Sequence, residues 1–109
     1  MYNFLTNYWY YQDAIKSADT VLVEFYATWC PHCKRMAPVV EQLTELLEGQ
    51  AKVIQLDIDR NEEAAKAENV ESVPTFIIYS HGKEMWRGSG EYQGDVLLAK
   101  VGKYAGHTA

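Results

Sequence analysis

The sequence predicts an α/β fold in which a mixed β-sheet packs against helices, and three observations carry this prediction. Strand-like and helix-like segments alternate over residues 21–68, which is typical of parallel βαβ units with a right-handed crossover. Residues 73–87 read as two strands joined by a tight turn, which indicates an antiparallel hairpin. The chain has 109 residues, 48 % of them hydrophobic, so we expect one domain spanning 1–109.

Charge and hydropathy argue against several classes of partner. The formal net charge is -5 at pH 7, and the Lys and Arg residues are scattered along the chain. We therefore expect neither a nucleic acid nor an anionic membrane surface as partner. No apolar run approaches the length needed to cross a bilayer. The first residues lack the basic and apolar segments of a signal peptide, so we expect a cytoplasmic location.

The first predicted helix is rich in aromatic residues. Thr6 or Asn7 could cap it, and the pattern runs to about residue 17, with Tyr8, Tyr11 and Ile15 on one face. This aromatic density could mark a binding surface. The favoured interpretation is that some rings cover the sheet and others are half exposed.

The next segments form the predicted centre of the fold. Residues 21–26 are a near-continuous apolar run, typical of a central strand covered on both faces, and Glu24 interrupts it. A helix is expected from about residue 30 to 48, since its apolar residues keep helical spacing. Pro38 inside it should kink it, and Gly49 suits its C-terminal end.

The second half of the chain completes the pattern. We expect a strand at 52–58, a short helix from about 59–61 to 68, and a strand at 73–79. His81 and Gly82 make a tight turn into a strand at 83–87. The segment 88–90, Gly-Ser-Gly, should end that strand, before a last helix at about 93–104 and a tail at 106–109.

The two cysteines of the chain stand three positions apart where the long helix should begin. Cys30 and Cys33 would share a face of the first turn, within disulfide reach. Unpaired backbone N–H groups and the helix dipole favour a thiolate at Cys30. Pro31 fits this turn because no N–H is needed there. We expect Cys30 to be the attacking nucleophile and Cys33, deeper and less exposed, to be the resolving thiol.

Metal binding and a structural disulfide are weaker interpretations of this pair. A closed zinc site needs four ligands, and His32, His81 and His107 do not repeat the spacing of the cysteines. A loop this short constrains the unfolded chain little, so its disulfide would add little stability. Two cysteines in an otherwise cysteine-free chain indicate redox catalysis. We expect no metal and no bound cofactor.

An ordered set of motifs resembles the thioredoxin family over essentially the whole chain. The motifs are VEFYATWCPHCKRMAP, a strand with LDID, then VPTF, then a hairpin with HGK and a following glycine. The resemblance implies a thioredoxin fold, with a central mixed sheet of four to five strands flanked by four α-helices. It also implies thiol-disulfide exchange on protein disulfides, with a thioredoxin reductase or similar electron donor, and we expect a monomer.

The resemblance also implies roles for single residues. Cys30 and Cys33 resemble the redox pair of the family, and Trp29 the indole that shields it. Pro74 resembles the family's cis-proline. A cis bond there would turn the backbone of Val73 toward the sulfurs, where its N–H and C=O would bind an extended substrate strand.

Three further positions complete the implied substrate-binding set. Thr75 stands beside the proline, and Pro31 lies between the two cysteines. Gly90 resembles the small residue that lets a substrate approach closely.

Two departures from the family pattern concern a carboxyl group. Glu24 stands where typical thioredoxins carry Asp, and its segment looks more like the catalytic domains of protein disulfide isomerases. It is either directed to a solvated edge or buried, and burial would raise its pKa and let it take the proton from Cys33, directly or through a water. Gln55 stands where a Lys usually faces this carboxylate, so burial should dominate the pKa.

The third departure is His32, because Pro-His is the pair found between the cysteines of strongly oxidising periplasmic disulfide oxidases. A protonated imidazole near Cys30 would stabilise the thiolate and make the disulfide a better oxidant. A solvated histidine with little effect is the alternative.

Three functions remain open at this point. The favoured one is a thioredoxin-like protein-disulfide reductase. An oxidase or isomerase running in the oxidising direction is the alternative. A non-catalytic binding module of the same fold would have no need of the complete set of Cys30, Cys33, Glu24 and Pro74.

Overall fold

The computed structural model describes residues 2–105 of the chain, and the side chains of residues 8–105. The predicted tail at 106–109 lies outside the described residues. Four helices and four strands follow one another in the order α1 (Tyr2–Ala14), β1 (Thr20–Tyr26), α2 (Pro31–Leu46), β2 (Lys52–Asp57), α3 (Glu62–Ala67), β3 (Thr75–Ser80), β4 (Lys83–Ser89) and α4 (Gly94–Tyr104).

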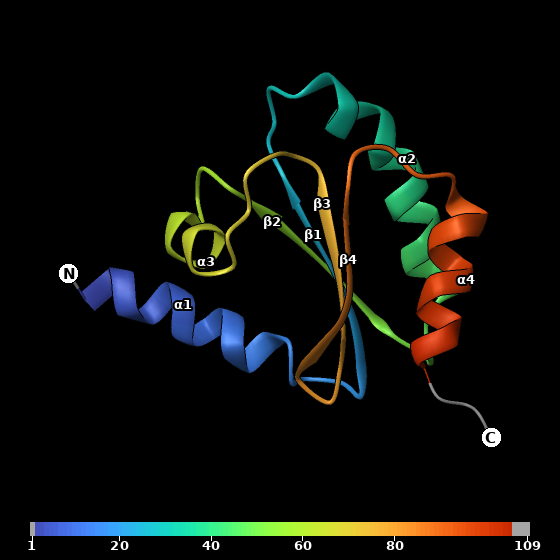
Figure 1. The fold of residues 1–109 in the computed structure, drawn as a ribbon, viewed down its shortest axis with the longest axis horizontal. Helices are drawn as coiled ribbons and strands as arrows, with labels where there is room; N and C mark the ends of the chain where they lie inside the picture. Colours follow the sequence, from blue (N-terminus) through green and yellow to red (C-terminus); the bar gives the residue numbers. More distant parts are fainter. Residues whose placement is uncertain (1, 106–109) are drawn as a thin grey trace.

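The strands form one mixed sheet in the order β2-β1-β3-β4. β1 pairs with β2 in parallel and with β3 antiparallel, and β3 pairs antiparallel with β4. Figure 1 shows α1 and α3 on one face of the sheet and α2 and α4 on the other. The predicted α/β architecture with four helices is confirmed, and the sheet has four strands.

The alternation of side chains along β1 divides the core into two layers, because successive residues of a strand point to opposite faces. Val21, Val23 and Phe25 are buried in the cluster that includes residues of α1 and α3. Leu22 is buried in the other cluster, with residues of α2 and α4. A strand covered on both faces explains the near-continuous apolar run in the sequence.

Helix α1 begins earlier than predicted. It runs from Tyr2 to Ala14, so Thr6 and Asn7 lie inside the helix and the predicted cap is wrong. Tyr11 and Ile15 are buried, as the predicted face requires, and Tyr8 packs beside them. Among the other described side chains of α1, those of Trp9 and Tyr10 are each 60 % exposed. The aromatic segment therefore both covers the sheet and faces solvent.

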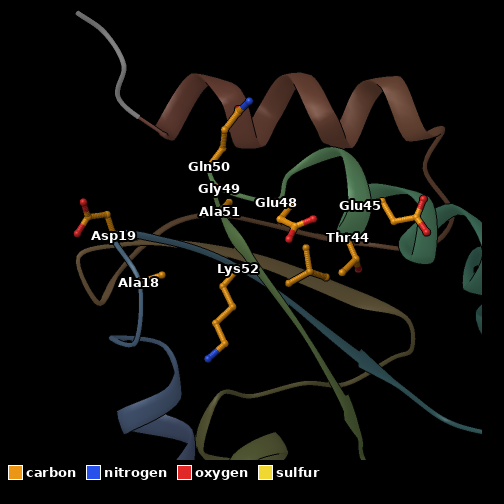
Figure 2. A pocket seen from close by; sticks show the side chains of 10 residues that line it. Ala18, Asp19, Thr44, Glu45, Glu48, Gly49, Gln50, Ala51 and Lys52 are labelled. Carbon is orange, nitrogen blue, oxygen red and sulfur yellow. The ribbon is translucent and has the colours of Figure 1, made fainter.

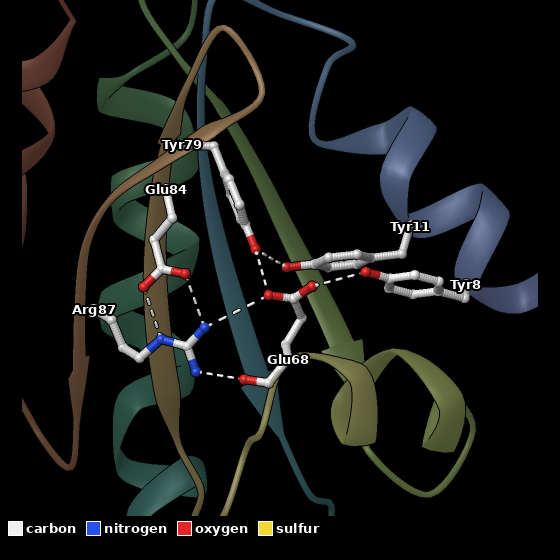
Figure 3. A network of polar contacts seen from close by, with 6 residues as sticks. All are labelled: Tyr8, Tyr11, Glu68, Tyr79, Glu84 and Arg87. Atoms are coloured by element: carbon white, nitrogen blue, oxygen red, sulfur yellow. Dashed lines mark hydrogen bonds and ion pairs between the residues drawn. The ribbon is translucent and has the colours of Figure 1, made fainter.

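A network of buried and half-buried polar groups attaches α1 and the end of α3 to the sheet (Figure 3). The carboxylate of Glu68 accepts hydrogen bonds from the hydroxyls of Tyr8 and Tyr79, each at 3.3 Å. Arg87 of β4 donates to the carbonyl oxygen of Glu68 at 2.6 Å. The hydroxyls of Tyr11 and Tyr79 are hydrogen-bonded to each other, and burial raises the pKa of both. Satisfied polar groups of this kind fix one packing arrangement for α1.

Helix α2 begins at Pro31, with Cys30 at the N-cap position in an extended conformation. Pro38 lies inside the helix, and Figure 1 shows α2 changing direction along its length. A proline lacks the N–H that the helix would use, so such a bend is expected there. The helix ends at Leu46, two residues before the predicted end, and Gly49 has a φ of +87° in the turn that leads to β2.

The antiparallel hairpin has the predicted turn but a longer second strand. His81 and Gly82 both have positive φ angles, of 53° and 80°, as a tight turn between two strands requires. β4 continues to Ser89, which pairs with Thr75 of β3, so the predicted break at 88–90 is wrong in its first two positions.

Gly88 has a packing role that the sequence did not reveal. A Cβ atom at this position would collide with the hydroxyl of Tyr92 and the indole of Trp86. The two rings meet edge to face, with centroids 5.5 Å apart. Gly88 therefore makes room for the rings of Trp86 and Tyr92, and the strand continues to Ser89.

The pocket in Figure 2 lies where β1 and β2 begin, whereas the cysteines follow the other end of β1. It has a volume of about 680 Å³ and is formed by the end of α2, the start of β2 and the turn before β1. No residue that the sequence analysis assigned to a site lines it; the lining residues are Ala18, Asp19, Thr44, Glu45, Glu48, Gly49, Gln50, Ala51, Lys52 and Val53. Within residues 2–105, none of the helices is long and apolar enough to span a membrane.

Candidate active site at the start of helix α2

The two cysteines are free thiols at the carboxyl end of β1, where the chain turns into α2. Cys30 and Cys33 are 4 % and 5 % exposed, and they pack with Ala27. The predicted difference in exposure between the two is not found, because both thiols are almost fully buried. The carbonyl of Val73 lies over Cys30, whose thiol donates to it at 3.6 Å, and this loop covers a sulfur that the helix alone would leave at the surface.

The Cys30 thiol has a lowered pKa. Burial acts in the opposite direction, since it disfavours a charge. This is outweighed by hydrogen bonds from the backbone N–H and the thiol of Cys33 and from the backbone N–H of His32, together with the positive charge of Arg35. The helix N-terminus therefore stabilises the thiolate at Cys30, as its sequence position predicts.

The Cys33 thiol has a raised pKa. Burial is the main cause, and the negative charges of the Cys30 thiolate and of Glu24 add to it, while a hydrogen bond with the backbone of Ala27 acts against it. At neutral pH Cys33 therefore keeps its proton while Cys30 is the more reactive sulfur. The pKa values of the two thiols are thus shifted in opposite directions, as expected for an attacking nucleophile and a resolving thiol.

Glu24 is buried inside the sheet layer on the side of α2, at 1 % exposure. This burial excludes the solvated-edge alternative. Gln55 lies opposite Glu24 in the parallel pairing of β1 with β2, and its amide donates to Oε1 of Glu24 at 3.0 Å. Burial raises the pKa of Glu24, and the hydrogen bond from Gln55 offsets only part of that rise.

The loop before β3 forms a backbone platform beside Cys30. The peptide bond between Val73 and Pro74 is cis, as the resemblance implied. The carbonyl of Pro74 accepts a hydrogen bond from the backbone N–H of Gly90 at 2.9 Å, so the loop after β4 is attached to the same platform. Thr75 is buried and opens β3 directly after the proline.

Gly90 occupies open space. Its φ is +97°, in the left-handed region that favours glycine, and an added Cβ would meet no atom within 4 Å. The backbone conformation therefore explains the residue type better than crowding within this chain does.

Trp29 and Pro31 lie at the rim of the site. The indole of Trp29 is 62 % exposed, and its N–H donates to the carboxylate of Asp59 at 2.9 Å. The resemblance implied an indole that shields the redox pair, whereas the structure places this ring largely in solvent beside the loop after β2. Pro31 is the first residue of α2.

His32, Arg35 and Glu91 form a charged cluster above Cys30. Nδ1 of His32 lies 2.7 Å from Oε2 of Glu91, and Nε of Arg35 donates to the same oxygen at 2.8 Å. Hydrogen bonds from Arg35 and His32 lower the pKa of Glu91 to about 2. The imidazole of His32 thus faces Glu91, and it is the backbone N–H of His32 that reaches the Cys30 sulfur.

The sequence analysis missed Arg35 and Glu91. The spacing of His32 and Arg35 on one helix face was readable, because residues at i and i+3 are neighbours. Glu91 stands on a different element, in the loop between β4 and α4, and nothing in the local pattern brings it to this helix. Among the described side chains, those of residues 8–105, no three of the His, Cys, Asp or Glu type gather as a metal site would require.

Sequence comparisons with known proteins support the family resemblance. The thioredoxin family model matches residues 3–103. A thioredoxin from Staphylococcus aureus is 45 % identical over 89 residues, which are 82 % of this chain and 85 % of that protein. Thioredoxin Y, a chloroplastic protein of Oryza sativa, is 35 % identical over 86 residues, or 79 % of this chain, and these span 51 % of its own length. The match thus covers about half of that relative.

Two further comparisons extend the likeness. A bifunctional thioredoxin reductase/thioredoxin from Mycobacterium leprae is 40 % identical over 78 residues, which are 72 % of this chain and 17 % of that protein. The solved structure of a mutant thioredoxin from Halobacterium salinarum superimposes with a TM-score of 0.82, at 32 % identity, over 91 % of this chain and 86 % of that chain. The chain therefore belongs to the thioredoxin family of thiol-disulfide oxidoreductases.

Proposed function

We propose that this protein reduces disulfides in other proteins by cycling Cys30 and Cys33 between a dithiol and a disulfide. The observation that carries the proposal is the opposite shift of the two thiol pKa values, lowered at Cys30 and raised at Cys33. One sulfur is thereby ready to attack a disulfide, while the other holds its proton until a second step needs it.

In the first step, the Cys30 thiolate attacks one sulfur of a substrate disulfide. The substrate S–S bond breaks, a mixed disulfide forms, and the other substrate sulfur leaves as a thiolate that takes a proton from solvent. The backbone N–H and C=O of Val73 would hold an extended substrate segment, in the manner of an added β-strand. Thr75 and the open space at Gly90 border that segment, and Trp29 and Pro31 line its rim.

In the second step, Cys33 loses its proton to Glu24, directly or through a water, and attacks the sulfur of Cys30. The mixed disulfide breaks, the substrate leaves with both cysteines reduced, and the protein retains the two-cysteine disulfide. The charge on Cys30, which raises the pKa of Cys33 in the free dithiol, is absent from the mixed disulfide. The pKa of Cys33 therefore falls when its proton must leave, and burial makes Glu24 a stronger base than an exposed carboxylate.

An outside protein must reduce the disulfide again. We propose a thioredoxin reductase or a similar donor, and a relative in which thioredoxin reductase and thioredoxin share one polypeptide supports this choice. The electrons travel on the two sulfurs, so the cycle needs no bound cofactor. We propose that the protein works as a monomer in the cytoplasm, where thiols are kept reduced.

The test is the reduction of insulin disulfides with NADPH and a thioredoxin reductase. We expect steady turnover by the native protein and none by Cys30→Ser. Cys33→Ser should accumulate a mixed disulfide, since its second step is blocked. Activity that requires an oxidant and a reduced protein substrate would instead establish the oxidising direction, and inactivity in both assays would leave a binding module.

An oxidase or isomerase is the second candidate, and the charged cluster above Cys30 favours it. Cationic groups beside the thiolate stabilise the dithiol and make the disulfide a stronger oxidant. Arg35 supplies such a charge, and a protonated His32 would add to it. The reduction potential separates the two directions.

A further inference from the structure

One carboxylate oxygen of Glu91 contacts two side chains, those of Arg35 and His32, at the edge of the redox site. Oε2 of Glu91 lies 2.8 Å from Nε and 2.7 Å from Nη2 of Arg35, and 2.7 Å from Nδ1 of His32. Nη2 of Arg35 is also 3.0 Å from Nδ1 of His32. The guanidinium is therefore fixed on the side of α2 that faces the loop after β4.

This cluster is too exposed to serve mainly the stability of the fold. The side chains of His32 and Arg35 are 59 % and 57 % exposed, and that of Glu91 is 37 % exposed. Exposed ion pairs contribute little to folding, because water screens the attraction and two long side chains lose conformational freedom. The same charges still act on a thiolate that lies beside them.

The charge of Arg35 reaches the reacting sulfur. It helps to lower the pKa of Cys30, and in turn the charge of the Cys30 thiolate helps to raise the pKa of Arg35, after the larger effect of Glu91. Glu91 thus has two opposed effects on the thiolate. It holds the guanidinium in place, which favours the thiolate, and it brings a negative charge, which disfavours it.

The position of Glu91 is itself fixed by the platform. The N–H of the preceding residue, Gly90, donates to the carbonyl of Pro74, so the loop that carries Glu91 is attached to the segment that borders Cys30. The cluster and the platform are therefore joined into one rim, built from α2 and from the loops before β3 and after β4.

We propose that Glu91 is a positioning residue for the redox pair, which holds the Arg35 guanidinium beside Cys30 and thereby sets how strongly the dithiol is favoured over the disulfide. The proposal deepens the proposed function and rests on it for Cys30 as the reacting sulfur. It assigns the control of the redox equilibrium to the Arg35–Glu91 pair, and no longer to the imidazole of His32 alone.

The test measures the equilibrium between the protein and glutathione, in which protein dithiol and oxidised glutathione give protein disulfide and two reduced glutathione molecules. Arg35→Gln should shift this equilibrium toward the disulfide by about threefold, the effect of one unit charge across a partly solvated distance. Glu91→Gln keeps an acceptor oxygen for the guanidinium and removes the counter-charge, so it should shift the equilibrium toward the dithiol by about threefold.

Glu91→Ala separates positioning from charge. It removes the same charge as Glu91→Gln but also releases Arg35 into solvent, so its shift toward the dithiol should be smaller. In the Arg35→Gln background, the Gln and Ala substitutions at Glu91 should have equal effects, because no guanidinium remains to be held. An Ala variant that shifts as far as the Gln variant, or a difference that persists without Arg35, would overturn the proposal.

Glu84→Gln is the matched control. Glu84 also pairs with an arginine, since Nε and Nη2 of Arg87 donate to its two oxygens at 2.9 Å each (Figure 3). Glu84 lies opposite Tyr79 near the hairpin turn, at the other end of β3 from Pro74. Its substitution should leave the glutathione equilibrium unchanged, and an equal shift would show that only net charge matters. The equilibrium needs no enzymatic turnover, so it tests Glu91 even if the insulin assay shows no activity.

Discussion

Two glutamates near the redox pair have opposite ionisation behaviour. Glu24 is buried on the side of the sheet that faces α2, the helix that carries Cys33. Its one hydrogen-bond donor among the described residues is the neutral Gln55, and its pKa is raised. Glu91 is partly exposed above Cys30, it binds Arg35 and His32, and its pKa is lowered to about 2. A carboxylate without a cationic partner keeps a higher pKa and can accept a proton. A carboxylate bound to cations stays ionised and holds those cations in place.

The difference matches the order of the two chemical steps. The step at Cys30 needs a stabilised anion, and the charged cluster supplies a cation beside it. The step at Cys33 needs a proton acceptor, and a buried carboxylate without a cation is the stronger base. Each of the following predictions changes one side of this comparison.

The largest effect is expected from Glu24→Gln. It removes the proton acceptor and keeps a side chain of the same shape, so turnover in the insulin assay should fall by about 100-fold while the fold stays intact. Circular dichroism and thermal unfolding check the fold, and Glu45→Gln on the exposed face of α2 is the control. An unchanged pH–rate profile in Glu24→Gln would contradict the proton-transfer role.

The next largest effect concerns the exposed charged groups beside Cys30. We expect a reduction potential above the value of about -270 mV that characterises thioredoxins and below the value of about -120 mV of the most oxidising periplasmic enzymes. A rise of 30 mV corresponds to a tenfold change in the two-electron equilibrium. Equilibration with glutathione measures it, and His32→Pro should lower it. A potential at or below that of thioredoxins would refute the expectation.

Gln55→Lys tests the buried Glu24, because it places a cation at the position where a Lys usually faces this carboxylate. The ammonium would lie opposite Glu24 in the β1–β2 pairing and lower its pKa, making it a weaker base. We expect turnover to fall several-fold and the acidic limb of the pH–rate profile to move to lower pH. Gln50→Lys, in the turn before β2, adds the same charge away from the site and should change neither. A profile that does not move would mean that Glu24 is not the group that titrates.

The smallest effect is on stability. Because burial raises the pKa of Glu24 in the folded protein, its contribution is fully present below the ordinary glutamate pKa of about 4.3 and is lost as the pH rises through the higher folded value. Relative to Glu24→Gln, the native protein should therefore lose unfolding free energy as the pH rises over that interval.

Glu91 should show the opposite slope. Its lowered pKa stabilises the fold above pH about 4.3, and that contribution is lost as the pH falls toward about 2. Because this carboxylate is solvent-screened, the difference between the native protein and Glu91→Gln should be small. Urea unfolding at a series of pH values measures both slopes, and two slopes of the same sign would contradict the comparison.

Local sequence patterns predicted most of the fold and half of the site. The apolar run at 21–26, the helical spacing after Pro31 and the tight turn at 81–82 each depend on residues that are close in sequence, so they could be read directly. The pairing of Cys30 with Cys33 is of the same kind, since one helical turn brings them together. The cis bond at Pro74 was implied by the family resemblance, and the structure contains it.

Only the tertiary structure decided what lies around those two sulfurs. The coverage of Cys30 by the Val73 carbonyl and the contact of Glu91 with Arg35 both join segments far apart in the chain. Periodicity describes the face of an element but does not say which distant element meets it. The sequence thus determined that this chain carries a redox pair at a helix start, and tertiary packing determined which charges surround the pair.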